Sequence, residues 1–275
     1  MTDTPIHPAL TPGRLAVVTG GASGIGLAAA HRFRDLGLSA CILDRNLSSI
    51  GVEGHDFIGH EIDISDAKAV HALAASLVAE HGPPAVLMNN AGIGGGGDIL
   101  GDLDAWESVI GTNLMGMIYG LKAFLPAMLD CDQPGLIINT GSKQGITQPP
   151  GNTAYNVSKS GVKALTEGLA HTLREKAGNR ITAHLLIPGF TYTGMIARHI
   201  PTQPPGAWSS EQVVYFMMES LARGDFYILC PDNDTPRETD EKRILWTAGD
   251  IVENRPALSR WHPDYKDAFD AFMAD

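Results

Sequence analysis

Three residues suited to proton transfer lie within the stretch GSKQGITQPPGNTAYNVSK, residues 141–159. Ser142 precedes Tyr155 by thirteen residues, and Lys159 follows the tyrosine by four. Residues four apart share one face of a helix, so this spacing predicts an ammonium near a phenol. A tyrosine with a pKa of about 10 is a poor base at neutral pH, and a neighbouring cation favours its phenolate. The spacing suggests general acid–base chemistry, although Y-x-x-x-K alone also occurs by chance in many helices.

Two neighbouring features extend this candidate set. Ser142 follows an apolar run, and its hydroxyl can hydrogen-bond the same substrate oxygen as Tyr155. Asn113 begins a helix expected over 112–130, where its side chain could hold a water or a backbone carbonyl behind Lys159. Lys143 suggests either a contact to an anionic group of the substrate or simple exposure on a polar loop, and a polar loop favours exposure.

The stretch TGGASGIG, residues 19–26, lies between a predicted strand and a predicted helix. Glycines at such a turn let the backbone approach a pyrophosphate, and the helix N-terminus offers unpaired N–H groups. The glycine spacing differs from the commoner G-x-G-x-x-G, but the strand–turn–helix context is the required one. The candidate nucleotide contacts here are Gly20, Ser23, Gly24, Ile25 and Gly26.

Acidic residues end the second and third predicted strands. Asp44 can accept both hydroxyls of an adenosine ribose and would repel a 2′-phosphate, which favours NAD over NADP. The adjacent Arg45 weakens this inference, because a guanidinium could bind that phosphate. Asp63 is placed to contact an adenine amino group, with Ile64 packing on the ring. The fourth strand ends in NNAG, where Asn90, Ala91 and Gly92 would let a cofactor lie against the backbone.

Short apolar runs alternate with longer helical patterns along the chain, which predicts βαβ units in one doubly wound parallel sheet of about seven strands, an α/β Rossmann-type fold. We expect a single domain over 1–275, with 14–140 mainly cofactor-binding, 141–230 catalytic and substrate-covering, and 231–275 a C-terminal extension. Predicted strands cover 14–19, 39–44, 55–63, 85–90, 135–140, 180–188 and 226–230. Predicted helices cover 24–36, 66–81, 112–130, 153–177, 209–223, 237–252 and 263–273.

The composition describes a globular chain without specialised segments. The 275 residues are 44% apolar and carry a formal net charge of −11, which argues against nucleic acid as the main partner. Three cysteines are too few and too scattered for a disulfide framework, and the ten histidines show no ligand spacing, so we expect no metal. The N-terminus has no signal-peptide pattern, and no apolar run approaches the length of a membrane span. These features predict a cytoplasmic protein without a membrane partner.

Taken in order, TGGASGIG, Asp63, NNAG, Asn113, Ser142, YNVSK and PGFTYT resemble the short-chain dehydrogenase/reductase family of the classical type. The resemblance covers about residues 15–193. It implies hydride transfer between a nicotinamide and an alcohol or carbonyl carbon.

The resemblance also implies residue roles. Tyr155 would be the general acid/base, Ser142 would polarise the substrate oxygen, and Asn113 would maintain a water relay. Lys159 would lower the tyrosine pKa and bind the nicotinamide ribose. In PGFTYT, the residues expected at the cofactor are Pro188, Gly189, Thr191 and Thr193.

The substrate is less well defined. Polar residues between the serine and the tyrosine could fix a polar substituent or cap local backbone, and the segment after Pro188 is apolar and aromatic. The candidate substrate contacts are Gln144, Gln148, Asn152, Tyr192 and Met195. We expect an NAD-dependent oxidoreductase acting on a medium-sized apolar or aromatic secondary alcohol or ketone. The alternatives are an NADP-dependent carbonyl or 3-oxoacyl reductase, or a non-catalytic NAD-binding regulator. The resemblance further implies a homodimer or homotetramer.

Overall fold

The computed structural model describes residues 7–50, 57–198 and 200–274. Within them, seven parallel strands form one sheet in the order β3-β2-β1-β4-β5-β6-β7. The strands are β1 (Leu15–Thr19), β2 (Ser39–Asp44), β3 (Ile58–Glu61), β4 (Val86–Asn89), β5 (Gly135–Thr140), β6 (Ile181–Ile187) and β7 (Tyr227–Leu229). The expected Rossmann-type fold is therefore confirmed.

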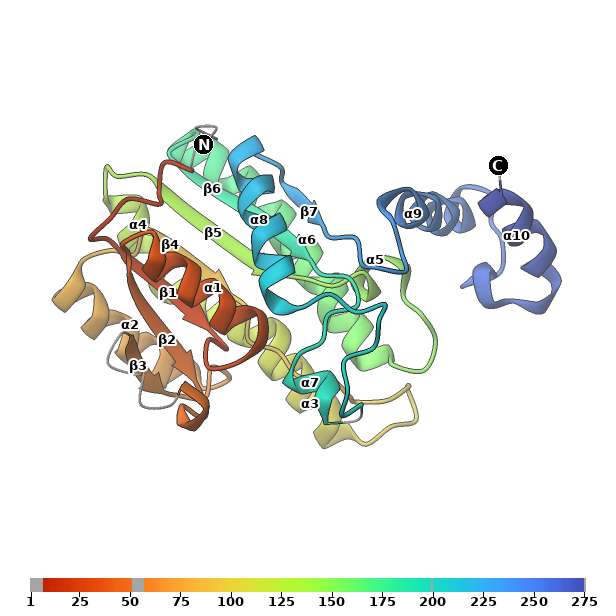
Figure 1. The fold of residues 1–275 in the computed structure, drawn as a ribbon, viewed down its shortest axis with the longest axis horizontal. Coiled ribbons are helices and arrows are strands. Elements are labelled where there is room, and N and C mark those ends of the chain that lie inside the picture. The colour runs from red at the N-terminus through yellow and green to blue at the C-terminus, as the bar shows by residue number, and fades with distance from the viewer. Residues whose placement is uncertain (1–6, 51–56, 199, 275) are drawn as a thin grey trace.

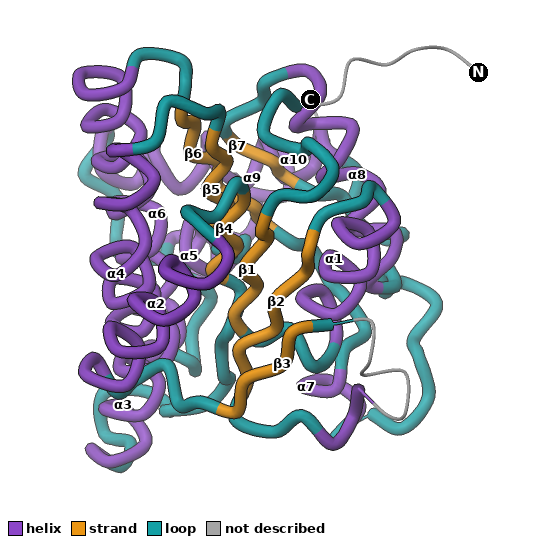
Figure 2. Tube along the Cα trace, turned by 90° about the vertical axis from the view of Figure 1, so that its left-hand side faces the viewer, coloured by secondary structure: helices purple, strands orange, loops and turns teal. Residues whose placement is uncertain are grey.

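Helices cover both faces of this sheet (Figure 2). On one face lie α1 (Gly24–Asp35) and α8 (Ser210–Arg223); on the other lie α2 (Ala67–His81), α4 (Gly116–Asp130) and α6 (Thr153–Ala177). Phe33 of α1 and Phe124 of α4 are fully buried in separate clusters on opposite faces. This double burial explains why the strands read as continuous apolar runs in the sequence.

Side-chain caps fix where several helices begin. The Asp66 carboxylate accepts hydrogen bonds from the backbone N–H groups of Lys68 and Ala69 at the start of α2. Ser209 and Gln212 form a reciprocal capping box at the start of α8. Such caps satisfy N–H groups that have no partner inside the helix. They place the first helical residues within one position of the predicted starts.

The long helix before β5 differs from its prediction. It begins at Leu103 as α3 (Leu103–Ile110), passes through a π-helical turn at Gly111–Met115 and continues as α4. Asp102 caps α3 by accepting from the Ala105 N–H. The expected start at residue 112 was therefore wrong, and Asn113 lies inside the helix at the π turn rather than at its beginning.

By length and hydropathy alone, the continuous helix Leu103–Asp130 could cross a membrane. The core helix of a globular protein passes the same test, and α4 packs its apolar face on α2 and β4. Phe124 and Met128 are almost fully buried there. The core thus accounts for the buried part of the apolar character of this helix.

Other differences are smaller. Strand β3 is shorter than the predicted 55–63, of which residues 55 and 56 lie outside the described residues. Two four-residue helices were not predicted, α5 (Gln144–Thr147) and α7 (Gly194–Ala197). Single 3-10 turns lie at Ser48–Ile50, Ser259–Trp261 and Pro263–Tyr265. All are too short for periodicity to identify.

The C-terminal extension projects from the α/β body as α9 (Arg237–Val252) and α10 (Lys266–Ala274) (Figure 1). It has a small core of its own around Trp246, whose ring contacts Phe269 and Phe272 and lies under the Arg255 guanidinium. The first turns of α9 contact α5, which follows β5. The extension therefore meets the body beside the turn that carries Ser142.

Two helical glycines allow a matched test of packing. A Cβ at Gly168 in α6 would meet no atom within 4 Å, whereas one at Gly116 in α4 would lie 2.4 Å from Ile64 Cδ1. Because alanine favours helix over glycine, Gly168→Ala should raise the free energy of unfolding by about 0.5–1 kcal/mol. Gly116→Ala should lower it by about 1–3 kcal/mol through overpacking. Urea denaturation of both variants checks this, and an equal effect of the two would contradict the packing described.

Candidate active site

The candidate residues gather at the carboxyl ends of the central strands. The strand order reverses between β1 and β4, which is where open α/β sheets bind ligands. The glycine-rich turn follows β1, Asn90 follows β4, and Ser142 follows β5. Helix α6 begins beside them and supplies Tyr155 and Lys159.

Ser142, Tyr155 and Lys159 converge as their spacing predicts. Ser142 and Tyr155 share a hydrogen bond, and the Gln144 backbone N–H donates to Ser142 Oγ at 3.2 Å. Lys159 Nζ lies 5.7 Å from the centre of the Tyr155 ring. The lysine is 3% exposed and donates to the Thr140 carbonyl at 2.8 Å. The ammonium is thus fixed by the end of β5 on the tyrosine side of α6.

Burial sets the protonation of this pair. It raises the pKa of the Tyr155 phenol above its usual value, and the hydrogen bond with Ser142 only partly opposes this. It also lowers the pKa of Lys159 to about 8. The protein alone therefore holds the phenol in its protonated form. The lowering of the tyrosine pKa that the family resemblance implies stays a prediction for the cofactor-bound protein.

The Asn113 side chain binds the backbone of another segment rather than facing an open site. Its Oδ1 accepts from the Ile93 N–H at 2.8 Å, and its Nδ2 donates to the Ile93 carbonyl at 3.0 Å and to Ser158 Oγ at 3.1 Å. The side chain is fully buried. The backbone carbonyl expected as its partner is therefore Ile93 O. The π turn directs this amide at the residues after β4, and π turns of this kind are frequent at functional sites.

Lys143 is neither exposed nor free, which corrects the expectation of a solvent-facing lysine. Its side chain is 18% exposed, and its Nζ lies 3.1 Å from Asp232 Oδ2 and 2.5 Å from Asp240 Oδ2. Both carboxylates come from the C-terminal part of the chain, which local sequence cannot connect to the turn after β5. With two anionic partners already, this ammonium is a poor site for a substrate anion.

The glycine-rich turn is built for close backbone packing. A Cβ on Gly20 would lie 2.6 Å from Ala91 Cα, and one on Gly26 would lie 2.2 Å from the Gly20 carbonyl oxygen. Asn90 Nδ2 donates to that carbonyl at 3.2 Å. Ser23 precedes α1 without a side-chain cap, and Ile25 packs on the core. The first turn of α1 therefore presents backbone N–H groups as a phosphate requires, so the turn fits a dinucleotide.

Asp44 and Asp63, the acidic residues expected at the adenosine end of a cofactor, have different hydrogen-bond partners. Asp44 accepts from the Ala22 N–H at 3.0 Å, which ties the end of β2 to the glycine-rich turn. The hydrogen bonds from Ser65 to Asp63 hold the pKa of that carboxyl below its usual value, with a smaller contribution from the Arg45 charge. Ile64 is 6% exposed and packs on Gly116, so little of its side chain remains for an adenine ring. The expected packing of Ile64 on the adenine ring stays a prediction.

The PGFTYT segment lies against the glycine-rich turn. Thr193 Cγ2 is 3.2 Å from where a Cβ on Gly24 would be, so the segment and the turn are in contact. Thr191 is buried, donates to the Gly189 carbonyl and pairs with Trp208 through a β-bridge. Pro188 and Gly189 follow β6 directly. The residues expected at the cofactor thus belong to one segment that leads from the end of β6 to the glycine-rich turn.

The substrate candidates divide into three groups. Gln144 Oε1 and Asn152 Oδ1 are buried without a hydrogen-bond partner in the described part of the chain. Gln148 is held locally, since its Nε2 donates to the Gly145 carbonyl and Ser160 Oγ. Tyr192 donates its hydroxyl to the Pro201 carbonyl, and Met195, 38% exposed, packs near Gly94. Among these candidates, only the first group has a buried polar atom without a partner in the described part of the chain.

A buried amide chain behind the site was not predicted. Asn89 donates to Asn139 at 2.9 Å, and Asn139 donates to Thr166 of α6 at 3.0 Å. Thr140 Oγ1 donates to Asn90 Oδ1 at 3.2 Å. These bonds join β4, β5 and α6, which carry the candidate residues. The polar residues that end the apolar runs VLMNN and LIINT were the available signal.

No cluster of histidine, cysteine and acidic residues among the described residues could hold a metal ion. His7 is partly buried: burial, and then the charge of His184, lower its pKa to about 4. Cys41 and Cys230 are buried, and burial raises the pKa of each thiol to about 12.

The buried Lys159 predicts a pH-dependent stability. Below pH 8 both folded and unfolded chains hold its proton, so the full burial penalty applies. Between about pH 8 and 10.5 the folded chain loses the proton while the unfolded chain keeps it, so stability rises with pH. Relative to Lys159→Met, the wild type should gain roughly 3 kcal/mol across this window.

Urea denaturation across this range tests the prediction. Lys163→Met is the control, since Lys163 lies on the same helix but is 38% exposed and paired with Glu167. A wild-type advantage over Lys159→Met that did not change with pH would show that Lys159 is not charged and buried as described.

Known proteins are similar to this chain over most of its length. The profile of the short chain dehydrogenase family matches residues 14–204. A putative ketoacyl reductase of the granaticin polyketide synthase from Streptomyces violaceoruber is 35% identical over 227 residues, 76% of this chain and 80% of that one. A short chain dehydrogenase/reductase from Burkholderia phymatum, solved in complex with NAD, is 30% identical, with a TM-score of 0.78 over 89% of this chain and 96% of that one.

A metagenomic short-chain oxidoreductase, solved in complex with NADP, is 26% identical. Its TM-score is 0.66 over 80% of this chain and 98% of that chain. The two solved neighbours thus carry different nicotinamide cofactors. The profile match covers more than two thirds of the 275 residues. This chain belongs to the short-chain dehydrogenase family.

Proposed function

We propose that this protein is an NAD-dependent oxidoreductase that transfers a hydride between a nicotinamide and a secondary alcohol or ketone. The observation that carries the proposal is the convergence of Ser142, Tyr155 and Lys159 at the switch point of the sheet. When bound, the nicotinamide supplies or accepts the hydride, while the protein positions the carbon and manages one proton.

Tyr155 handles that proton at its phenolic oxygen. In ketone reduction the phenol donates to the substrate oxygen, and in alcohol oxidation the phenolate accepts from it. The raised pKa of Tyr155 suits the donor role at neutral pH. Ser142 shares a hydrogen bond with the phenol, so its hydroxyl can orient the same substrate oxygen. Lys159 stabilises the phenolate by its charge, and Asn113 supports the backbone after β4.

The site would bind the cofactor along the ends of β1, β2, β4 and β6. The glycine-rich turn would hold the pyrophosphate, Asp44 the adenosine ribose, and Thr193 the nicotinamide end. The negative charge of Asp44 beside the Ala22 N–H is what favours NAD. The charge of Arg45 acts on the Asp63 carboxylate. This supports an unphosphorylated ribose against the NADP alternative.

The substrate class follows from two features. Met195 and Phe190 are each 38% exposed near the site, which favours a medium-sized substrate with an apolar part. The unused oxygens of Gln144 and Asn152 favour a hydroxyl or amide donor on the same substrate. A 3-oxoacyl group is the alternative, supported by the name of the granaticin relative. Assembly into a homodimer or homotetramer through α4 and α6 stays a prediction.

Asp44→Asn tests the cofactor preference. The amide oxygen can still accept from the Ala22 N–H, but the charge that repels a 2′-phosphate is gone. The ratio of kcat/KM for NAD to that for NADP should fall by about tenfold or more, the equivalent of roughly 1.4 kcal/mol. Asp66→Asn, at another carboxylate that accepts from backbone N–H groups, is the control. An unchanged ratio would remove Asp44 as the determinant.

Tyr155→Phe tests the proton-transfer role. The substitution keeps the ring and removes the hydroxyl, so the rate should fall by roughly 100- to 10,000-fold with little loss of stability. A panel of secondary alcohols and ketones, followed by NADH absorbance with NAD and NADP in parallel, provides the measurement. Near wild-type turnover of the variant would refute the mechanism.

A further inference from the structure

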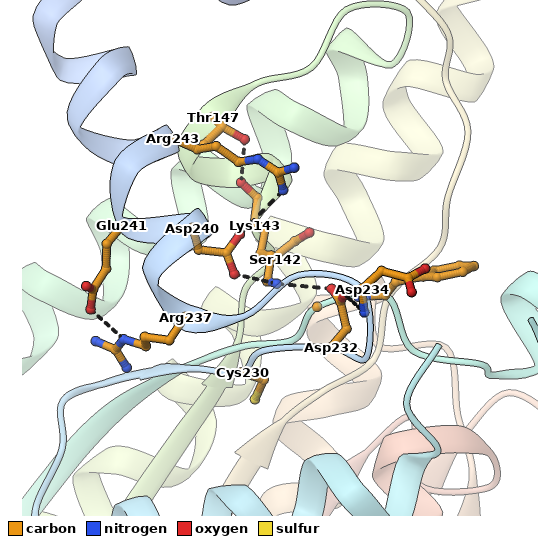
Figure 3. A network of polar contacts seen from close by, with 12 residues as sticks. Ser142, Lys143, Thr147, Cys230, Asp232, Asp234, Arg237, Asp240, Glu241 and Arg243 are labelled. Carbon is orange, nitrogen blue, oxygen red and sulfur yellow. Dashed lines mark hydrogen bonds and ion pairs between the residues drawn. The ribbon is translucent and has the colours of Figure 1, made fainter. Parts of the chain in front are cut away.

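A buried charge cluster joins the C-terminal extension to the turn that carries Ser142 (Figure 3). Lys143 Nζ lies between Asp232, which follows β7, and Asp240, on the first turn of α9. The side chains of both aspartates are 6% exposed. Asp240 Oδ1 also lies 3.8 Å from the Arg243 guanidinium. Two cations and two anions are thus gathered outside the catalytic set.

Asp232 connects this cluster to the segment after β6. Its Oδ2 accepts from the Phe190 N–H at 3.1 Å. A Cβ placed on Gly189 would lie 2.7 Å from Asp232 Oδ2 and 2.9 Å from Lys143 Nζ. The ion pair therefore rests directly on the Gly189 backbone, and no side chain could fit between them. Gly189 belongs to the segment proposed to lie at the nicotinamide.

Lys143 connects the same cluster to the serine. Its backbone carbonyl accepts from the N–H groups of Ile146 and Thr147, which closes the short helix α5. The next residue, Gln144, donates its N–H to Ser142 Oγ. The side chain of Lys143 thus binds the extension while its backbone fixes the turn that orients the serine hydroxyl.

The charges of the cluster depend on one another. Burial acts to raise the pKa of Asp232, but the Phe190 hydrogen bond and the Lys143 charge together hold it below its usual value. Burial raises the pKa of Asp240, with Lys143 opposing. Removing one member of a buried ion group leaves an uncompensated charge, which is strongly unfavourable. Each member therefore constrains where the others can lie.

We propose that Lys143 and Asp240 are positioning residues that, through Asp232, hold the Gly189–Phe190 backbone and the Ser142 turn in a fixed relation. Helix α9 of the C-terminal extension is thereby a working part of the active site, although it supplies no group that touches the substrate. The kinetic part of this inference rests on the proposed function. Its structural part does not.

Asp240→Asn tests the inference with Glu241→Gln as the matched control. Glu241 is the next residue on α9, but it forms an exposed pair with Arg237 away from the cluster. In the unliganded protein, hydrogen exchange at the Phe190 amide should accelerate about tenfold in Asp240→Asn and stay unchanged in Glu241→Gln. With NAD and an alcohol, kcat/KM should fall about tenfold in Asp240→Asn only.

A double variant that combines Lys143→Met with Asp240→Asn provides a second test. Lys143→Met alone leaves two carboxylates facing each other, so combining it with Asp240→Asn should recover part of the loss in kcat/KM rather than add to it. If Asp240→Asn does not fold, Lys143→Arg, which keeps the charge and changes its geometry, takes its place in both measurements.

The outcomes separate the two proposals. A lower Tm in Asp240→Asn with unchanged Phe190 exchange and unchanged kcat/KM would overturn the inference, because the cluster would then only attach the extension. A wild type inactive with both cofactors would refute the proposed function, and the exchange measurement would still decide the inference.

Discussion

The buried ammonium of Lys159 is the constraint on which the rest of the site depends. A lysine that is 3% exposed is costly to keep charged, and its hydrogen bond to the Thr140 carbonyl offsets only part of that cost. The end of β5 must therefore stay fixed against α6. The amide chain from Asn89 through Asn139 to Thr166 provides this, because it crosses the same strands and the same helix. The geometry of the candidate site thus depends on buried polar contacts within the same strands and helix.

A second layer of constraint comes from chain segments far apart in sequence. Asn113 binds the backbone of Ile93 from a π turn, and Thr193 packs on the glycine-rich turn. The charge cluster around Lys143 adds the C-terminal extension to this layer. Each contact fixes one loop at the carboxyl edge of the sheet. The loops that would hold cofactor and substrate are therefore positioned by buried groups rather than by their own sequence.

Sequence patterns predicted the features that depend on neighbouring residues along the chain. The bounds of α6 and the pairing of Tyr155 with Lys159 follow from helical periodicity, and the edges of every described strand but β3 follow, within one residue, from apolar runs covered on both faces. The early start of the helix at Leu103 was missed, as was the π turn around Asn113, whose hydrogen bonds reach a different segment. The partners of Lys143 were missed for the same reason, since Asp232 lies 89 residues away in sequence. No periodicity connects such residues.

Direct observation of hydride transfer tests the central claim of this account. The protein would be incubated with NAD and a panel of secondary alcohols that carry deuterium at the carbinol carbon. We predict that the NADH formed contains one deuterium, detected by mass spectrometry, and that Tyr155→Phe forms almost none. NADH that carries no deuterium, or equal labelling by Tyr155→Phe, would contradict the account.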